Sequence, residues 1–457
     1  MANPDLKVVS ALTGEEEDNT SPDTLAVRRL QQEWALSTIG GELRVISLRQ
    51  VADFRNQKEG VDVFYYKLSD ADLMLRRAIE AMGLPVTKPS TVIQQFKDSP
   101  LTRVFNSVSS CPDEGDEDTL CLWRNLACNP EDGKWPTIRE FLEDVICSSD
   151  NKLFLYLLRY LAHMLQKPAE KPGIFIVLYG EEGVGKGFFS QLLQRIWGRS
   201  VLIVQSIDSV VGAFNNQLEH GFIVWLDEAM FEGAKAQNDK LKSLITEPYI
   251  QISGKYQPTR NIKSPHRWFA STNRKRVAEV RHDDRRQVPI NVANTYKQDV
   301  EYFGALANVL QDGAEVNAFV HQLLNLDIST FEPRDRPKTA EAINQKILSL
   351  SGLARYWYEV LVQGEFSIGC EFIYRDTSWT EPKFIRSADI KQCYLRSNKQ
   401  AERYESIQER AIYSELEKIC PSAQKTREDN RHGLSLPHID VARAEFEQWI
   451  GDKLTWD

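Results

Sequence analysis

A glycine-rich segment of the sequence has residue types and spacing that suit phosphate binding. Gly180, Gly185 and Lys186 fit the pattern G-x-x-x-x-G-K within GEEGVGKGFF. In such a loop the backbone N–H groups and the start of the next helix surround phosphate oxygens, and the lysine neutralises them. The alternative is an ordinary glycine-rich turn. We predict an ATP site formed by Gly180, Glu182, Gly183, Val184, Gly185, Lys186, Gly187 and Phe188.

The residue after the lysine departs from this pattern. Gly187 stands where a serine or threonine would offer Mg²⁺ a hydroxyl ligand. Ser190 lies about one helical turn further on, which we expect to be too far. A hydroxyl is one of about six magnesium ligands, so water, Asp227 and phosphate oxygens can complete the shell. The sequence therefore predicts a working ATP and Mg²⁺ site.

Acidic and amide side chains follow two further apolar segments. Asp227 and Glu228 end the run FIVWL, and Asn273 ends WFASTN. A carboxylate at such a position can hold Mg²⁺, its neighbour can polarise the attacking water, and an amide can hydrogen-bond the γ-phosphate. Each residue alone is also a common strand end or turn. Together with the loop they predict a catalytic centre with Asp227 as the metal ligand.

Two arginines, Arg285 and Arg286, precede a fourth apolar segment. An arginine here can reach a neighbouring subunit and stabilise the charge of the transition state. The alternative is a pair of surface ion pairs with Asp283 and Asp284, which would contribute little.

Basic residues gather in the same part of the chain. The whole sequence has a net charge of −9, yet residues 255–286 hold ten Lys or Arg and three acidic residues. Residues 250–264 are expected to form a hairpin with a lysine and a tyrosine near its tip. Lysine binds phosphate and an aromatic ring stacks on bases, which suits single-stranded DNA. The predicted DNA-binding residues are Lys255, Tyr256, Arg260 and Lys263; a solvated basic hairpin is the alternative.

These residues need a parallel sheet to bring them together. Four short apolar segments, separated by helical ones, predict a doubly wound α/β fold. The expected strands are residues 173–180, 221–229, 266–273 and 285–292. A helix is predicted after the loop, from Phe188 to Gly198, and others at 70–83 and 153–165.

Composition limits the remaining options. The 457 residues suggest two or three domains. Seven scattered cysteines without a C-x-x-C pair indicate reduced thiols and argue against zinc. With no apolar signal or spanning segment, we expect no membrane contact and a cytoplasmic location, in a host or bacterial cell. The predicted parts are a disordered acidic tail (1–28), a mainly helical N-terminal or collar region (29–150), an ATPase domain (151–328), and a small C-terminal α+β domain (329–457). Residues 330–339 are the expected linker.

The order of these motifs resembles superfamily 3 helicases, which are AAA+ motors. The closest likeness is to the helicase part of phage, plasmid and mobile-element primase-helicases, including poxvirus-type relatives. The segments GEEGVGKGFF, FNNQLEHGFIVWLDEA, KLKSLITEP and STN…HDDRR carry it, and it extends from about residue 95 to the terminal FEQWIGDKLTWD. Glycine after the lysine is frequent in phage members, so Gly187 agrees with the likeness.

The resemblance implies roles for the candidate residues. Lys186 corresponds to the Walker A lysine, Asp227 and Glu228 to Walker B, and Asn273 to sensor 1. Arg286, or less favourably Arg285, corresponds to an arginine finger. Lys255 and Tyr256 correspond to a pore hairpin, although Tyr256 replaces the histidine that the family often has.

The likeness also implies an assembly and a substrate. We expect a homo-oligomeric ring, a hexamer, that translocates on single-stranded or forked DNA, with a primase or polymerase on a separate chain. The C-terminal domain is expected to bind DNA or a partner, with a winged helix as one option. Two other functions stay open: an AAA+ NTPase that remodels or loads replication proteins, and a nucleotide-gated DNA-binding module that does not unwind.

Overall fold

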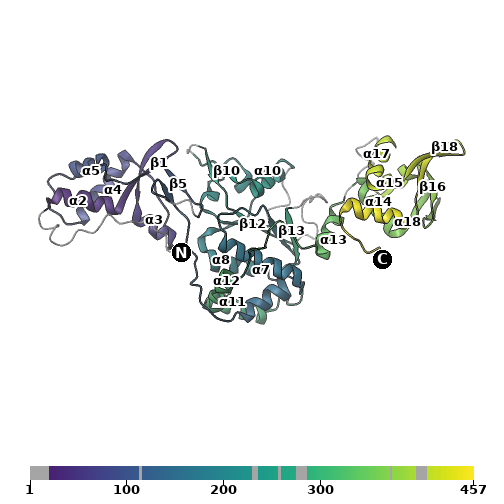
Figure 1. The fold of residues 1–457 in the computed structure, drawn as a ribbon, viewed down its shortest axis with the longest axis horizontal. Coiled ribbons are helices and arrows are strands. Elements are labelled where there is room, and N and C mark those ends of the chain that lie inside the picture. The colour runs from purple at the N-terminus through teal and green to yellow at the C-terminus, as the bar shows by residue number, and fades with distance from the viewer. Residues whose placement is uncertain are drawn as a thin grey trace. The chain divides into compact units, whose positions relative to one another are not determined.

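The computed structural model describes residues 20–112, 116–228, 235–255, 259–273, 286–350, 352–370, 373–397 and 409–456. The chain divides into two compact units (Figure 1). Unit 1 comprises Met1–Arg274 with Arg286–Pro337, and unit 2 comprises Lys275–Arg285 with Lys338–Asp457. The boundary after Pro337 falls inside the proline-containing segment 330–339. The predicted border at residue 150 does not separate compact units, because both sides of it belong to unit 1.

The centre of unit 1 is a five-stranded sheet in which all neighbouring strands are parallel. The strand order is β13-β7-β12-β9-β8. The strands are β7 (Phe175–Tyr179), β8 (Val201–Val204), β9 (Ile223–Asp227), β12 (Arg267–Thr272) and β13 (Gln287–Asn291). Four of them correspond to the predicted strands. β8 was not predicted, because four apolar residues directly after a helix give no clear period.

The strands of this sheet are apolar because helices and loops cover both of its faces. Every residue of β7 and β12 is buried. Alternate strand residues, such as Ile176, Trp225 and Phe269, join one cluster with residues of four helices. Figure 1 shows these helices grouped on one side of the strands. They are α7 (Asn151–Gln166), α8 (Lys186–Trp197), α11 (Val300–Asp312) and α12 (Ala314–Asn325).

The same cluster extends upstream of residue 151. It contains Trp135, Ile138 and Phe141, which lie on or next to α6 (Pro136–Glu140) and the π-helical turn Phe141–Ile146. The residues from about 135 therefore pack with the sheet. In the sequence, β8 and β9 are separated by α9 (Asp208–Val211). β9 and β12 are separated by α10 (Lys235–Thr246) and by the hairpin of β10 (Tyr249–Ile252) and β11 (Arg260–Lys263).

The N-terminal part of unit 1 combines helices with a four-stranded sheet of order β3-β2-β1-β4, and this sheet was not part of the expectation of a mainly helical region. Two glycines with positive φ, Gly40 and Gly41, join β1 to β2. A two-residue turn of this kind is a hairpin signal that the helical interpretation overlooked. The elements are α2 (Pro22–Glu33), β1 (Trp34–Ile39), β2 (Glu42–Ser47), α3 (Leu48–Arg55), β3 (Tyr66–Lys67), α4 (Leu68–Ala81), α5 (Pro89–Asp98), β4 (Val104–Phe105), β5 (Ser107–Ser109) and β6 (Thr119–Cys121).

Helix α2 also shortens the predicted acidic tail. The tail was expected to reach residue 28, but the helix begins at Pro22, where Ser21 accepts a hydrogen bond from the backbone N–H of Thr24. Buried Ala26 and Leu30 then pack with the N-terminal core. Residues 1–19 lie outside the described part of the chain.

Unit 2 has its own hydrophobic core and an α+β composition, as expected. A three-stranded antiparallel sheet has the order β16-β18-β17, and β14 pairs with β15. The winged-helix option stays a prediction. The elements are α13 (Ala340–Ser349), α14 (Gly352–Gln363), β14 (Glu365–Cys370), β15 (Ile373–Ser378), β16 (Lys383–Arg386), α15 (Ser387–Ser397), α17 (Glu409–Ile419), β17 (Gln424–Glu428), β18 (Arg431–Leu436) and α18 (Ile439–Ile450).

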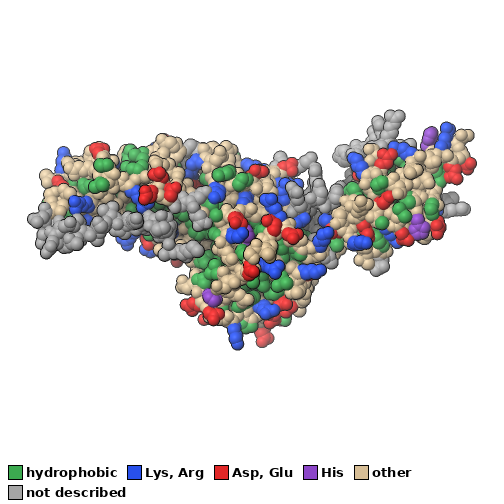
Figure 2. All heavy atoms as spheres, viewed as in Figure 1, with side chains coloured by type: hydrophobic (Ala, Val, Ile, Leu, Met, Phe, Trp, Pro, Cys, Tyr) green, Lys and Arg blue, Asp and Glu red, His purple; other side chains and the backbone are tan. Residues whose placement is uncertain are grey.

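The face of the molecule in Figure 2 shows no simple separation of charge. On the face in Figure 2, Lys and Arg side chains are interspersed with Asp and Glu side chains. A nucleic-acid contact would therefore depend on particular residues rather than on the overall field. Within the described ranges, no helix is both long enough and apolar enough to cross a bilayer.

Candidate nucleotide-binding site

The glycine-rich loop lies between the carboxyl end of β7 and the first turn of α8. Gly183 and Gly185 have φ angles of +78° and +106°, which glycine adopts far more readily than other residues. A Cβ at Gly185 would lie 3.0 Å from the Phe303 ring. Glycine is thus required here both for the turn and for close packing.

Lys186 is the first residue of α8, and its side chain is folded back over the loop. The Nζ atom donates hydrogen bonds to the carbonyl oxygens of Gly180 (2.7 Å) and Glu181 (2.6 Å), and to Oδ1 of Asn273 (2.8 Å). The pKa of Lys186 is lowered, mainly by burial, and nearby carboxylates such as Glu228 and Asp227 offset part of this shift.

Asp227 is the last residue of β9, and a neighbouring strand orients its carboxylate. Ser271 of β12 pairs with Asp227 in the sheet, and its hydroxyl donates to Oδ1 of Asp227 at 2.6 Å. The indole N–H of Trp225 donates to the same hydroxyl at 3.2 Å. These bonds fix one carboxylate oxygen. The whole side chain is exposed at the strand end.

Asn273 and Glu228 extend this polar row. The side-chain amide of Asn273 donates to Oε1 of Glu228, while its oxygen accepts from Lys186. Asn273 therefore links the side chains of Lys186 and Glu228. Glu228 has a φ of +52°, a conformation that is unusual for a residue other than glycine and that often marks functional sites.

These residues meet because their strands are parallel neighbours. β12 lies between β7 and β9, so the loop, Asp227 and Asn273 all occupy the carboxyl edge of the sheet. The chain leaves β7 for β8 at one edge of the sheet and leaves β12 for β13 at the other edge. The point between two strands whose connections run in opposite directions is where α/β sheets bind ligands. The predicted convergence of Lys186, Asp227, Glu228 and Asn273 is observed in the structure.

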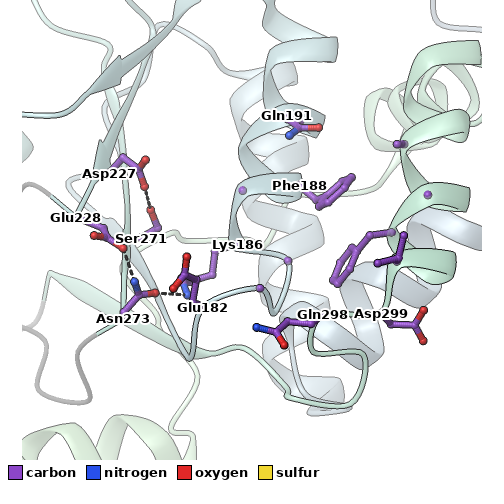
Figure 3. Close-up of a pocket in the computed structure, with 17 residues that line it drawn as sticks. Glu182, Lys186, Phe188, Gln191, Asp227, Glu228, Ser271, Asn273, Gln298 and Asp299 are labelled. Atoms are coloured by element: carbon purple, nitrogen blue, oxygen red, sulfur yellow. Dashed lines mark hydrogen bonds between the residues drawn. The ribbon is translucent and has the colours of Figure 1, made fainter.

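The converging side chains border a pocket of about 750 Å³ (Figure 3). Its size lies in the range of small-molecule sites. Among the described residues no group of three or more metal-ligating side chains occurs. Asp227 with Glu228 nearby fits Mg²⁺ nevertheless, because this ion usually takes one or two carboxylates plus substrate phosphates. The lining residues are Glu182, Gly183, Gly185, Lys186, Gly187, Phe188, Gln191, Asp227, Glu228, Ser271, Asn273, Gln298, Asp299, Val300, Phe303, Gly304 and Ala307.

Two residues of the predicted loop do not line the pocket. Val184 is buried in the core, and Gly180 is represented at the site only by the carbonyl that Lys186 contacts. Ser190 does not line the pocket, and its hydroxyl donates to the carbonyl of Gly187 at 2.8 Å; that it lies too far to bind Mg²⁺ stays a prediction.

The predicted arginine finger lies at the opposite edge of the sheet. Arg286 precedes β13, and its carbonyl accepts a hydrogen bond from Phe175 N, at the amino end of β7. It does not line the pocket of its own chain. Any role of Arg286 in hydrolysis would therefore concern a neighbouring subunit. Arg285 lies outside the described residues.

The predicted basic hairpin is present. β10 and β11 pair from Tyr249 with Lys263 to Ile252 with Arg260, and exposed Lys255 follows β10. Arg260 has a contact that was not foreseen. It forms a largely buried ion pair with Glu219 at 2.7 Å, so we do not include it in a DNA contact. Tyr256 lies outside the described residues.

Sequence reasoning missed eight residues of the pocket: Gln191, Ser271, Gln298, Asp299, Val300, Phe303, Gly304 and Ala307. Ser271 was hidden inside an apolar strand, and only its pairing with Asp227 shows its place. Gln298 and Phe303 come from the segment after β13, which carries no motif. A polar residue at the strand position next to a predicted Walker B acid would have been the signal for Ser271.

Comparisons with known proteins give a partial match. Residues 178–286 match a family described as one of unknown function (DUF5906). The DNA primase-polymerase of Nitratiruptor phage NrS-1 is 25% identical over 152 residues, which is 33% of this chain. The match spans only 21% of that phage protein.

Solved structures share the fold over a longer range. An apo structure of the NrS-1 C-terminal region has a TM-score of 0.63 at 15% identity, covering 92% of this chain and 100% of that one. An A-form apo structure of the same region has a TM-score of 0.62 with the same coverage. The chain is therefore similar in sequence to part of a phage DNA primase-polymerase and shares the mixed α/β fold of that protein's C-terminal region.

Proposed function

We propose that this chain is the ATP-hydrolysing motor of a phage-type DNA replication system, a superfamily 3-like AAA+ helicase. The observation that carries the proposal is the meeting of Lys186, Asp227, Glu228 and Asn273 at one edge of a parallel sheet, around a nucleotide-sized pocket. The similarity to a phage DNA primase-polymerase supports the setting in replication.

The side chains have distinct roles in this proposal. Bound Mg²⁺ would neutralise phosphate charge; Asp227, oriented by Ser271, would hold it. Lys186 would neutralise the phosphates, and Glu228 would polarise the attacking water. Asn273 contacts both Lys186 and Glu228, so it would hold these two side chains in a fixed position relative to each other.

ATP hydrolysis with and without single-stranded DNA is the first test. We expect hydrolysis that DNA stimulates, and displacement of a strand from forked DNA that requires ATP. ATP hydrolysis without strand displacement would favour the second candidate, an NTPase that loads or remodels replication proteins. The observation that favours this second candidate is the similarity to part of a DNA primase-polymerase, which is a replication protein. Absence of both nucleotide binding and hydrolysis would leave a DNA-binding module.

The hairpin is proposed to grip DNA. Replacing Lys255 and Tyr256 by alanine should preserve basal hydrolysis and remove DNA stimulation, because the ATP site would be intact while the hairpin no longer bound DNA. Each lost phosphate contact should reduce the slope of log affinity against log salt by up to about 0.7. Lys134→Ala, at an exposed lysine outside the hairpin, is the matched control. Unchanged stimulation in the double variant would refute the assignment.

A ring would require Arg286 to act on its neighbour. Arg286→Ala should bind ATP without hydrolysing it. Mixing it with Lys186→Ala protein should restore part of the activity, because some interfaces then combine an intact site with an intact finger. If exchange of subunits is demonstrated and no activity returns, the finger assignment fails.

A further inference from the structure

The pocket has two chemically different ends, and the glycine-rich loop lies between them. In Figure 3 the charged and polar side chains of Asp227, Glu228 and Asn273 lie on one side of Lys186, and Phe188 lies on the other. The second end is mainly apolar, with Gln191, Gln298 and Asp299 as its polar lining residues. It is built by Phe188 of α8 and by Val300, Phe303, Gly304 and Ala307 of α11.

The apolar end is one face of a helix. Positions 300, 303, 304 and 307 follow the helical period, so they share a face of α11. Leu306 and Leu310 of the same helix are buried in the core. The pocket face is not covered, and Val300 is 86% exposed. An apolar helix face that borders a pocket is suited to an apolar part of a ligand.

Aromatic rings give this wall a flat and rigid surface. The rings of Phe188 and Phe303 stack with centroids 4.9 Å apart and an interplanar angle of 18°. Tyr302 packs edge-on against Phe303 and stacks on Tyr296 at 3.9 Å. Phe303 also lies against Gly185 of the loop. The wall is therefore fixed directly beside the predicted phosphate site.

Gly304 keeps the wall open. Glycine inside a helix is destabilising relative to alanine, so its presence calls for a reason. Close approach of another element is the usual one, but a Cβ at Gly304 would meet no atom within 4 Å. The missing side chain instead leaves space on the pocket face of α11, next to the ring of Phe303.

Gln298 brings a donor and an acceptor to the same pocket. Its backbone N–H donates to the carbonyl of Gly183 at 3.0 Å, and its φ is +59°. A Cβ at Gly183 would lie 2.9 Å from Cγ of Gln298, so glutamine and loop pack closely. This strained and anchored backbone holds an amide side chain at the pocket (Figure 3). Neighbouring Asp299 is already used, since it caps α11 by accepting from Tyr302 N.

We propose that this apolar wall is a purine-base site, with the base stacked beside Gly304 on the Phe303 side and its edge read by Gln298. A glutamine amide matches the adjacent donor and acceptor of adenine at N6 and N7, whereas guanine presents two acceptors there. The site would thus select ATP over GTP and over pyrimidine nucleotides. This inference rests on the proposed function, because it names the substrate of the same pocket.

Gly304→Leu is the direct test, with Ala305→Leu as the matched control. Ala305 is the next residue of α11, is exposed and does not line the pocket. Titration with a non-hydrolysable ATP analogue and with inorganic tripolyphosphate separates base binding from phosphate binding. Gly304→Leu should weaken the analogue on the order of 10- to 100-fold and leave tripolyphosphate unchanged, because base stacking has this magnitude. Ala305→Leu should behave as the unaltered protein.

Gln298→Ala supplies a second measurement that does not depend on the helix. It should reduce the preference for ATP over GTP on the order of 10-fold, with tripolyphosphate binding retained. Gly304→Leu protein that melts normally and binds the analogue with unaltered affinity would overturn the base site. An unaltered protein that binds ATP no tighter than tripolyphosphate would do the same while leaving the proposed function intact. Binding of neither ligand would refute the proposed function itself.

Discussion

The two ends of the central sheet both carry charged side chains but use them differently. At the carboxyl end, Lys186, Asp227 and Glu228 border a pocket. At the amino end, Arg267 and His266 are buried at the start of β12, and their partners are mainly backbone carbonyls. Both groups look equally polar in the sequence.

The amino-end side chains find most of their hydrogen-bond partners within the protein, although Nε of Arg267 is buried without one. Arg267 donates to the carbonyls of Pro265 and Lys167, each at 3.0 Å, and lies over the ring of Phe222. His266 bonds to Ser264 and to the carbonyl of Leu218, both at 2.8 Å. Burial lowers the pKa of Arg267 to about 10 and that of His266 to about 4.

The difference separates stability from function in one sheet. A buried charge that is hydrogen-bonded to surrounding backbone holds segments together, and its removal leaves unpaired groups. Lys186 is also buried and hydrogen-bonded, but two of its three partners are carbonyls of its own loop, and its side chain borders the pocket, where a ligand can replace them. Variants at the two ends should therefore give opposite results in activity and stability measurements.

The largest effect is expected at the carboxyl end. Lys186→Ala should lower ATP hydrolysis on the order of 10²–10³-fold, because a preorganised positive charge on the transferring phosphate is lost. The free energy of unfolding should fall by about 1–2 kcal/mol, less than in Arg267→Ala, because the backbone partners of Lys186 lie in its own loop at the edge of the pocket. Steady-state hydrolysis and urea unfolding of the same preparation check both. Near-normal hydrolysis by folded variant protein would remove the nucleotide-site assignment.

Arg267→Ala should show the reverse. We expect the free energy of unfolding to fall by about 2–4 kcal/mol, since packing and several hydrogen bonds to a charged group are lost together. The hydrolysis rate per folded molecule should stay within about threefold of normal. Arg267→Lys should recover little stability, because an ammonium group cannot reproduce the guanidinium geometry. A stable Arg267→Ala protein with impaired hydrolysis would reverse the comparison.

The sequence predicted the carboxyl end better than the amino end, for a physical reason. Lys186, Asp227 and Asn273 each follow a short apolar strand, and parallel strands bring such ends together without further information. Arg267 and His266 stand within the same basic window as Lys255, so burial alone distinguishes them. Charge counts could not show that the first two are structural.

Elements that depend on tertiary pairing were not predictable in the same way. β8 is too short to show a period, and Ser271 gains its meaning only from its partner across the sheet. The pocket face of α11 reads as an ordinary amphipathic helix until the neighbouring loop is in place. Conversely, the hairpin at Gly40 and Gly41 had a local signal that was available and was not used.

A change of stability of similar size is expected on acidification. The ordinary pKa of 6.5 for His266 is lowered to about 4, first by burial and also by Lys171 and Arg267 nearby. The unfolded chain therefore binds more protons between about pH 6.5 and 4, so the stability contribution should fall through this window and level off below it. The fall is on the order of 3 kcal/mol. Urea unfolding from pH 7 to 4 should be less pH-dependent in His266→Gln; an unchanged profile would contradict this origin.

The smallest effect is expected beside Lys186 itself. A Cβ at Gly187 would meet no atom within 4 Å, whereas a Cβ at Gly185 would lie 3.0 Å from the Phe303 ring, and Gly185 has a φ of +106°. Gly187→Ser should therefore keep ATP hydrolysis within about threefold of normal, and helix propensity should change stability by less than about 1 kcal/mol. The added hydroxyl can join the magnesium shell, so half-maximal activity should need less Mg²⁺ or the same amount.

Gly185→Ser, two residues away, should lose activity through backbone strain and contact with Phe303. A magnesium titration of hydrolysis for both variants measures the contrast. If folded Gly187→Ser protein loses hydrolysis as Gly185→Ser does, glycine at 187 is needed for close approach of the ligand. The space around Gly187 would then be filled by the bound ligand, although no protein atom lies within 4 Å of a Cβ there.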